Sequence, residues 1–346
     1  MASKGIYIYG IVPNFYGTTH FQSLENSGVY AITFENISAI VSDRDSVHLD
    51  FLDRESLGYL LVHHQETIEE LMGKGFSMII PMRLGTIMGS KEEVIKILAN
   101  GHDLIIDTLK KIEYLTEIDL AVTWADFSIT IKEIAGHPEV IALKEDILKS
   151  GEQLSQAHQV KIGMLFQAKL AEKNKKVELK ILEALSQHCV HVKMHDVMND
   201  QMITNSAFLM NRNKKEKFEE VIEQLDDEFK GLLNFKLVGP LPCYSFYTIE
   251  VKELNQEQVL LAKKELGLRE ETTESDIKKA YLEKARLFHP DTQQDNGDEE
   301  NFNRINKAYH TMLEYSVAAR QCSDEEVISL AKEKIILNLT LVKIKE

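Results

Sequence analysis

The tripeptide His289-Pro290-Asp291 lies between two amphipathic segments, and this arrangement limits what the C-terminal third of the chain can form. Apolar residues recur at helical spacing over 274–288 and again over 299–313. Proline fixes its own backbone and biases the residue before it away from the helical conformation. The pattern therefore predicts an antiparallel helical hairpin with a shared core and a rigid tip at 289–291.

The first helix of this predicted hairpin has a basic polar face. Thr273-Glu274-Ser275-Asp276 fits a capping box at its start, and its apolar stripe runs through Ile277 and Phe288. The opposite face is predicted to carry four cations: Lys278, Lys279, Lys284 and Arg286. A basic face beside a rigid tip is suited to docking on an acidic partner. The plainer alternative is an ordinary helical hairpin with His289 in a turn.

These segments resemble the J domain of DnaJ-type co-chaperones. Matching stretches are Leu266-Gly267-Leu268, 277–281 and 302–309, in addition to the tripeptide. The resemblance implies that His289, Pro290 and Asp291 trigger ATP hydrolysis in a DnaK-type chaperone. It also implies that the partner is contacted by the basic face, made of Lys278, Lys279, Lys284 and Arg286.

Length, charge and hydropathy restrict the class of protein. The chain has 346 residues, a net charge of −15 and 44% hydrophobic residues, which predicts two or three domains with well-packed cores. Its acidity argues against a general nucleic-acid binder, and no apolar run approaches the ~20 residues of a membrane span. The first residues lack a signal-peptide pattern, so we expect a cytoplasmic protein with no membrane partner.

The first 250 residues alternate between strand and helix patterns. Strands are predicted at 5–12, 29–34 and 37–42, the last two as a hairpin, with helices at 53–72 and 90–114. An alternating segment at 120–132 carries the only tryptophan, Trp124. Helical segments at 138–187 then precede strand, strand, helix, strand and strand, ending near Val251, and most of this order is ferredoxin-like.

The predicted fold class is α+β, with two tandem small α/β (ferredoxin-like) domains and an all-α helical hairpin. The predicted domains are residues 1–133, 134–253 and 254–316. Residues 317–346 form a terminal helix and strand that return to the second domain, because a lone strand at 335–344 needs a sheet to join. A frayed tail is the alternative.

Four segments resemble the GvpF/GvpL family of gas vesicle accessory proteins. They are Gly5–Val12, His63–Leu71, Ile80–Thr86 and Val238–Phe246. In the last one Cys243 replaces the second proline of the usual pair. The family-motif residues are Pro81, Arg83, Gly85, Thr86, Gly239, Pro240, Tyr244 and Phe246.

The family resemblance implies a non-enzymatic protein that binds the small hydrophobic shell protein GvpA and assists early gas vesicle assembly. Arg83 is expected to satisfy local carbonyl groups or to pair with a carboxylate of the preceding helix, such as Glu66 or Glu69, and a binding role is the alternative. Pro240 and Pro242 are expected to block ladder pairing at the entry to the last strand. The strand-rich part is expected to leave an edge that accepts a partner strand.

The sequence gives little support for a metal site or a bound cofactor. Cys189, Cys243 and Cys322 are widely spaced and form no disulfide framework. His191 and His195 share a face of a predicted strand but lie about 13 Å apart at ~3.3 Å per residue, too far to share an ion unaided. Gly73-Lys74-Gly75 lacks the rest of any nucleotide-binding fingerprint. We therefore predict no metal and no cofactor.

The combined prediction is a gas vesicle assembly protein that binds GvpA and recruits a DnaK-type chaperone through its J domain. Other gas vesicle accessory proteins are further candidate partners, and we expect the protein to be associated with gas vesicles. The alternative is a minor structural component of the vesicle whose J-like domain only docks. An enzyme would need convergent titratable groups in a pocket, and no such pattern stands out in the sequence.

Overall fold

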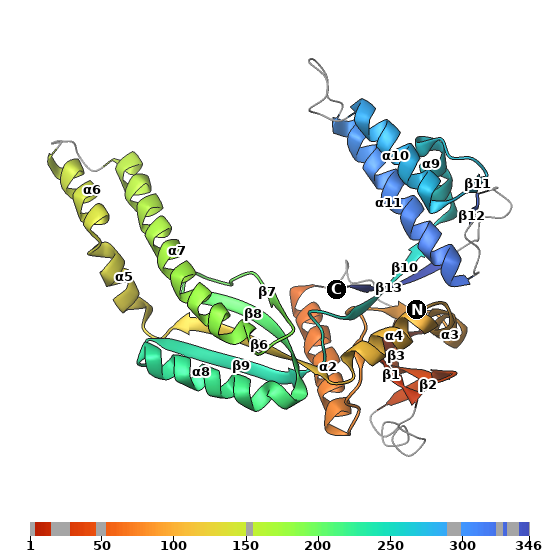
Figure 1. Cartoon of the computed structure of the whole chain (residues 1–346), viewed down its shortest axis with the longest axis horizontal. Coiled ribbons are helices and arrows are strands. Elements are labelled where there is room, and N and C mark those ends of the chain that lie inside the picture. Colours follow the sequence, from red (N-terminus) through yellow and green to blue (C-terminus); the bar gives the residue numbers. More distant parts are fainter. Residues whose placement is uncertain are drawn as a thin grey trace. The chain divides into compact units, whose positions relative to one another are not determined.

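The computed structural model describes residues 4–14, 28–45, 53–149, 155–288, 299–322, 328–330 and 339–345 (Figure 1). The chain forms two compact units. Unit 1 combines Met1–Lys110 with Tyr247–Glu346, and unit 2 is Lys111–Phe246. Both units contain antiparallel sheets and helices, so the predicted α+β class is confirmed.

The N-terminal part of unit 1 is a sheet in the order β2-β3-β1-β4, with β5 also paired to β1. Its strands are β1 (Lys4–Pro13), β2 (Val29–Phe34), β3 (Ile37–Asp45), β4 (Ile80–Pro81) and β5 (Ile87–Met88). The predicted hairpin of β2 and β3 is present, and Glu35 in its turn adopts a positive φ of 50°. β1 lies at the centre of the sheet, and its residues Tyr7 to Val12 are buried.

Three helices accompany this sheet: α2 (Arg54–Gly73), α3 (Lys91–Asn100) and α4 (His102–Ile112). Asp53 caps α2 by accepting a hydrogen bond from the Ser56 amide at 2.7 Å, and Ser90 caps α3 as predicted. The single helix predicted over 90–114 is interrupted at Gly101. A Cβ atom at this glycine would lie 2.7 Å from Cγ1 of Val342, so the interruption accommodates a distant segment of the chain.

The C-terminal part of unit 1 places a helical segment between two paired strands. Its elements are β10 (Thr248–Leu254), α9 (Gln256–Leu266), β11 (Glu271–Thr272), α10 (Glu274–Phe288), α11 (Glu299–Cys322), β12 (Ile328–Ser329) and β13 (Leu339–Lys345). β13 pairs antiparallel with β10, and a parallel bridge from Met82 to Ile249 links this pair to the first sheet. The strand predicted at 335–344 therefore exists from Leu339, whereas residues 335–338 lie outside the described residues.

The helical segment shares a core with β10 and β13. α11 extends to Cys322, beyond the predicted end at Leu313, because its last turns stay buried through Tyr315 and Ala318. Gln321 near its end exchanges two hydrogen bonds with the backbone of Val342 on β13. The buried side chains of this core are Leu254, Val259, Ala262, Leu266, Ile277, Ile305, Ala308, Met312, Tyr315, Ala318, Ala319, Ile328, Leu330, Leu339 and Leu341.

Unit 2 is a four-stranded antiparallel sheet in the order β7-β8-β6-β9. The strands are β6 (Leu115–Trp124), β7 (His191–Met194), β8 (Met202–Asn211) and β9 (Leu233–Leu241). The helices are α5 (Phe127–Ala135), α6 (Pro138–Lys149), α7 (Gln156–Ser186) and α8 (Lys215–Phe229), with a short 3-10 turn, η3 (Arg212–Lys214). Residues of α7 and α8, including Ile181 and Phe218, share one core with the sheet, which completes a β-α-β-β-α-β ferredoxin-like order.

The alternating segment at 120–132 is not one strand. β6 ends at Trp124, and Asp126 then caps α5 by accepting a hydrogen bond from the Ser128 amide at 2.9 Å. Ile129 and Ile131 produced the apparent alternation, but both lie on α5 and are 46% and 40% exposed. β6 pairs with β8 and β9, so the compact units divide at residues 110 and 246, whereas the sequence placed boundaries after 133 and 253.

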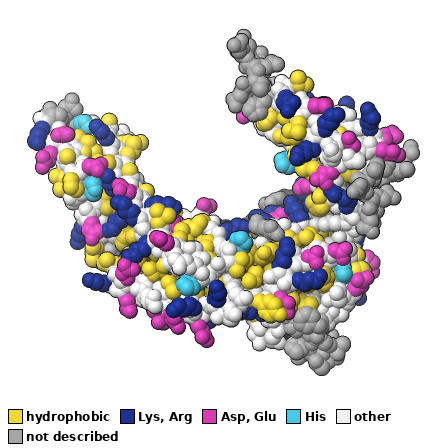
Figure 2. All heavy atoms as spheres, in the orientation of Figure 1, with side chains coloured by type: hydrophobic (Ala, Val, Ile, Leu, Met, Phe, Trp, Pro, Cys, Tyr) yellow, Lys and Arg dark blue, Asp and Glu magenta, His cyan; other side chains and the backbone are white. Residues whose placement is uncertain are grey.

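Helices α5 to α7 expose many apolar side chains to solvent (Figure 2). The most exposed are Leu148 at 75% and Met164 at 69%. Among the described residues, no helix has the length and hydropathy needed to cross a bilayer.

Candidate functional site

The start of α10 is organised by a reciprocal capping box. The Asp276 amide donates to Thr273 Oγ1 at 3.2 Å, and the Thr273 amide donates to Asp276 Oδ2 at 2.9 Å. The hydrogen bonds from Thr273 hold the pKa of the Asp276 carboxyl below its usual value. The preceding helix α9 ends as predicted at Gly267, whose φ of 71° provides the left-handed cap.

One face of α10 packs into the helical core. Ile277 is fully buried, and the ring of Tyr281 stacks on Tyr309 of α11 with centroids 4.1 Å apart. The Tyr281 hydroxyl also donates to Asn306 Oδ1 at 2.7 Å. These contacts fix the rotation of α10 about its axis, and therefore determine which side chains it presents to solvent.

The solvent-facing side of α10 carries Lys278, Lys279 and Arg286, all exposed, together with Leu282 at 46% exposure. We call Lys278, Lys279 and Arg286 the cationic face. The assignment of Lys284 to this face is wrong. Lys284 follows Ile277 by seven residues, which returns it to the same side of the helix, and its half-buried ammonium donates to the carbonyl oxygen of Glu265 near the end of α9.

The tripeptide His289-Pro290-Asp291 lies outside the described residues. α10 ends at Phe288 and α11 begins at Glu299, so the two helices flank it as predicted.

The motif at 80–86 forms a turn bound to neighbouring strands. Pro81 pairs with Gly10 of β1, and the Arg83 amide donates to the carbonyl oxygen of Ile249 at 2.9 Å. Thr86 Oγ1 donates to the Arg83 carbonyl at 2.6 Å. Gly85 has a φ of 80°, a conformation that favours glycine.

Of the roles considered for Arg83, the pairing with Glu66 or Glu69 is wrong. The Arg83 guanidinium lies 3.8 Å from Glu250 on β10, and not beside Glu66 or Glu69 of α2. Its side chain is 66% exposed, so this ion pair contributes little to stability. Arg83 therefore projects to solvent from a turn that its backbone holds in place.

Sequence reasoning missed a buried polar pair beneath this turn. The Tyr7 hydroxyl lies 2.7 Å from His64 Nδ1 of α2, and the Gly85 amide donates to the same hydroxyl at 3.4 Å. Burial raises the pKa of Tyr7 to about 12 and lowers the pKa of His64 to about 4. His64 therefore stays neutral at neutral pH. The sequence feature that could have indicated this pair is His64 itself, because it lies on the apolar stripe of helix α2.

The closing motif at 238–246 packs against β6 in unit 2. A Cβ atom at Gly239 would lie 2.9 Å from the Glu117 carbonyl oxygen, and the residue adopts a φ of 148°. Gly239 and Pro240 lie at a register shift opposite residues 117–119, where proline removes no ladder bond. Tyr244 donates its amide to Pro242, and Phe246 is buried.

Glu117 is the anchor of this motif, and it was not predicted. Its side chain is 1% exposed and accepts hydrogen bonds from the Ser245 amide and the Ser245 hydroxyl, both at 2.8 Å. Burial raises the pKa of Glu117 to about 8, and it also raises the pKa of neighbouring Asp119. Two acidic residues two positions apart in an otherwise apolar strand were the available signal.

His191 and His195, the histidines considered as metal ligands, do not lie in a metal-binding arrangement. His195 Nε2 lies 3.1 Å from the Ser245 hydroxyl, and His191 is exposed on β7. The described part of the chain contains no group of three His, Cys, Asp or Glu side chains arranged to hold a metal ion. Cys243 is buried, and burial raises the pKa of its thiol to about 12.

The fold and these sites define an α+β protein with a helical module set between two of its strands. Residues 5–248 match the family model described as "Gas vesicle synthesis protein GvpL/GvpF", and residues 264–317 match the DnaJ domain model. The chain belongs to the GvpL/GvpF family and carries a DnaJ domain near its C-terminus.

Individual relatives support both assignments. The chain is 23% identical over 248 residues to gas vesicle protein F of Dolichospermum flosaquae, covering 71% of this chain and 98% of that one. It is 41% identical over 49 residues to chaperone protein DnaJ 1 of Aquifex aeolicus, which covers 14% of each chain.

Two solved structures share the fold. The crystal structure of GvpF from Anabaena sp. PCC7120 superposes with a TM-score of 0.55 at 21% identity, covering 70% of this chain and 98% of that one. GvpF from Microcystis aeruginosa gives a TM-score of 0.54 at 20% identity, again covering 70% and 98%.

Proposed function

We propose that this protein binds the shell protein GvpA on gas vesicles under assembly and recruits a DnaK-type chaperone to it through its DnaJ domain. The observation that carries the proposal is the presence of both modules in one chain, with an exposed cationic face beside the segment that contains His289-Pro290-Asp291. Other gas vesicle accessory proteins are further proposed partners.

The cationic face is the proposed first contact with the chaperone. Lys278, Lys279 and Arg286 point away from the core that α10 shares with α9 and α11, so a partner can reach them without disturbing that core. Clustered cations accelerate encounter with an acidic surface, and this effect weakens as salt screens the charges. Lys284 is excluded from the proposed contact, because its ammonium is held by the carbonyl of Glu265.

A shell protein that polymerises through apolar surface is prone to aggregate before it is assembled. A DnaJ domain on the protein that holds it would direct ATP-driven binding and release to that place. The family-motif residues are proposed to shape the body that holds it: Pro81, Gly85 and Thr86 form one turn, and Gly239, Pro240, Tyr244 and Phe246 form the close packing on β6.

The test is single-turnover ATP hydrolysis by the DnaK-type chaperone of the host, with and without this protein and with and without GvpA. Wild type is expected to stimulate hydrolysis, and more strongly when GvpA is present. His289→Gln should abolish the stimulation and leave GvpA binding intact. Undiminished stimulation by His289→Gln would refute the mechanism.

A charge-reversal pair tests the cationic face. Lys279→Glu should raise the concentration needed for half-maximal stimulation by about tenfold, which corresponds to about 1.4 kcal/mol. The matched control is Lys264→Glu, which reverses an exposed charge on α9 and should behave as wild type. Equal effects of the two variants would mean that net charge matters and the cationic face does not.

The competing function is a minor structural component of the vesicle with a DnaJ domain that only docks. It predicts co-sedimentation with purified vesicles and no change in ATP hydrolysis.

A further inference from the structure

The outer edge of β2 is open among the described residues. β2 pairs with β3 in a register that joins Phe34 to Ile37 across the turn and Ile32 to Ala39. Because alternate residues of an edge strand bond inward, the amide and carbonyl groups of Ala31 and Thr33 point away from β3. Within the described ranges, no backbone hydrogen bond reaches these outward groups.

Other edge strands of the protein carry features that discourage pairing with another chain. β7 is only four residues long and contains Lys193, β9 contains Lys236 and the irregular Gly239-Pro240 step, and β13 contains Lys343. Charges, proline and bulges are the usual protection of a sheet edge. β2 has six residues, Val-Tyr-Ala-Ile-Thr-Phe, with no charge and no proline, and its register is continuous.

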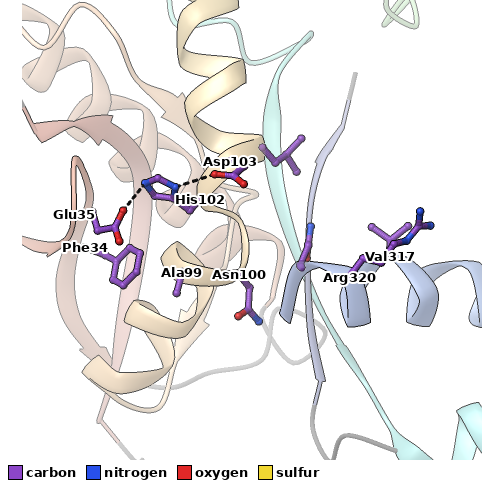
Figure 3. Close-up of a pocket in the computed structure, with 10 residues that line it drawn as sticks. Phe34, Glu35, Ala99, Asn100, His102, Asp103, Val317 and Arg320 are labelled. Carbon is purple, nitrogen blue, oxygen red and sulfur yellow. Dashed lines mark hydrogen bonds and ion pairs between the residues drawn. The ribbon is translucent and has the colours of Figure 1, made fainter. Parts of the chain in front are cut away.

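Acidic side chains lie near both ends of β2, although at the Val29 end the carboxylate belongs to the neighbouring strand β3. Near Val29, Asp43 accepts a hydrogen bond from the Tyr30 hydroxyl at 2.7 Å. Beyond Phe34, the carboxylates of Glu35 and Asp103 flank the ring of His102 and line a hollow of about 620 Å³ (Figure 3). The Asp103 side chain is fully exposed.

This charge distribution distinguishes between possible occupants. If two copies paired β2 with β2 in antiparallel order, Glu35 of one copy would lie at the end of the ladder where the other copy carries Asp43 one strand inward, and these like charges would disfavour the pairing. An uncharged extended segment with basic residues at its ends meets opposite charges instead. Its length would be about six residues, or ~20 Å.

We propose that β2 is the strand acceptor of this protein, and that it pairs with an extended apolar segment of the shell protein flanked by lysine or arginine. The added strand bonds to the outward amide and carbonyl groups of Ala31 and Thr33. This inference rests on the proposed binding of the shell protein, and it assigns that binding to one edge of one sheet.

The test removes a single outward N–H group. Thr33→Pro deletes an amide that makes no bond to β3, so proline is tolerated in the fold but blocks strand addition. The matched control is Thr33→Ala, because it keeps the amide and loses only the hydroxyl contact with Ser38 at 2.9 Å. With shell protein fused to a soluble carrier, Thr33→Pro should bind at least tenfold more weakly than wild type, and Thr33→Ala within about twofold.

Backbone hydrogen exchange of the wild-type protein provides a measurement that needs no variant. Exchange at Ala31 and Thr33 should slow at least tenfold when the fused shell protein is added. If wild type binds but folded Thr33→Pro binds equally well, or if exchange at both amides is unchanged, the assignment to β2 is overturned and the proposed function stands. If wild type does not bind the shell protein, the proposed function fails and this inference fails with it.

Size-exclusion chromatography tests whether a second copy of this chain pairs with β2 instead. A dimer of the wild-type chain that becomes monomeric with Thr33→Pro would show that β2 pairs with its own copy, which overturns the proposal.

Discussion

Replacing Glu117 with glutamine should make the stability of unit 2 less dependent on pH. The carboxyl is buried, and its pKa rises from an ordinary value of 4.5 to about 8 in the folded protein. Between these values the unfolded chain loses the proton and the folded chain keeps it. Wild-type stability should therefore be greatest below pH 4.5 and should decrease as pH rises toward 8, as far as this residue is concerned.

The magnitude follows from the size of the shift. Each unit of pKa corresponds to about 1.4 kcal/mol, so the raised pKa implies a loss of several kcal/mol above pH 8. Glutamine resembles the protonated acid, because it is neutral, has nearly the same shape and has an oxygen that can accept the Ser245 amide. Glu117→Gln should match wild type near pH 4.5 and exceed its stability by several kcal/mol at pH 8.5.

The assay is denaturant unfolding followed by tryptophan fluorescence. Trp124 is the only tryptophan, it lies in unit 2 and it is 4% exposed, so its emission reports on this unit alone. The control is Glu223→Gln on α8, where the glutamate is exposed and no comparable effect is expected. A constant difference between Glu117→Gln and wild type from pH 5 to pH 8.5 would refute the claim that residue 117 is protonated in the fold.

Three further substitutions test packing and hydrogen bonding in unit 1 by hydrogen exchange. Gly101→Ala should destabilise the unit by about 1–3 kcal/mol, because its Cβ would lie 2.7 Å from Cγ1 of Val342; wild-type exchange would contradict this contact. Tyr7→Phe should cost about 1–3 kcal/mol, since it leaves His64 Nδ1 buried without its hydroxyl partner, and wild-type protection around α2 would argue against the bond. Thr273→Ala should weaken α10 by about 0.5–2 kcal/mol through loss of its capping box, seen as faster exchange in the first turn.

Local patterns were sufficient to predict most elements of this protein. Turn chemistry located the β2–β3 hairpin, Ser90 located the start of α3, and helical spacing located α10 and its buried Ile277. Each of these features depends on residues that are close in sequence. The two ferredoxin-like sheets were also recognisable, because their strands and helices follow one another in a characteristic order.

The remaining features depend on residues that are distant in sequence. Gly101, where the helix breaks, packs against Val342 with no room for a side chain, and the partner of Arg83 is Glu250. No local pattern indicates either contact. Ile129 and Ile131 extended the apolar–polar alternation that suggested a strand, although both lie on α5. Two apolar residues at alternate positions are too few to distinguish a strand from a short capped helix. Among the candidate site residues, Lys278, Lys279 and Arg286 were placed correctly on the exposed face, whereas Lys284 was misplaced although its seven-residue spacing from Ile277 already put it on the buried side of α10.

The pairing of β10 with β13 has a consequence for the architecture of the chain. Leu254 and Leu339 are directly opposed at the end of the ladder, so the chain leaves the body and returns to it at adjacent points. The whole helical module thus occupies the position of a hairpin loop. Loop closure depends only weakly on loop length, so the β10–β13 ladder can close over an insertion of this size. The DnaJ domain match therefore lies within a single insertion whose two ends meet at one strand pair.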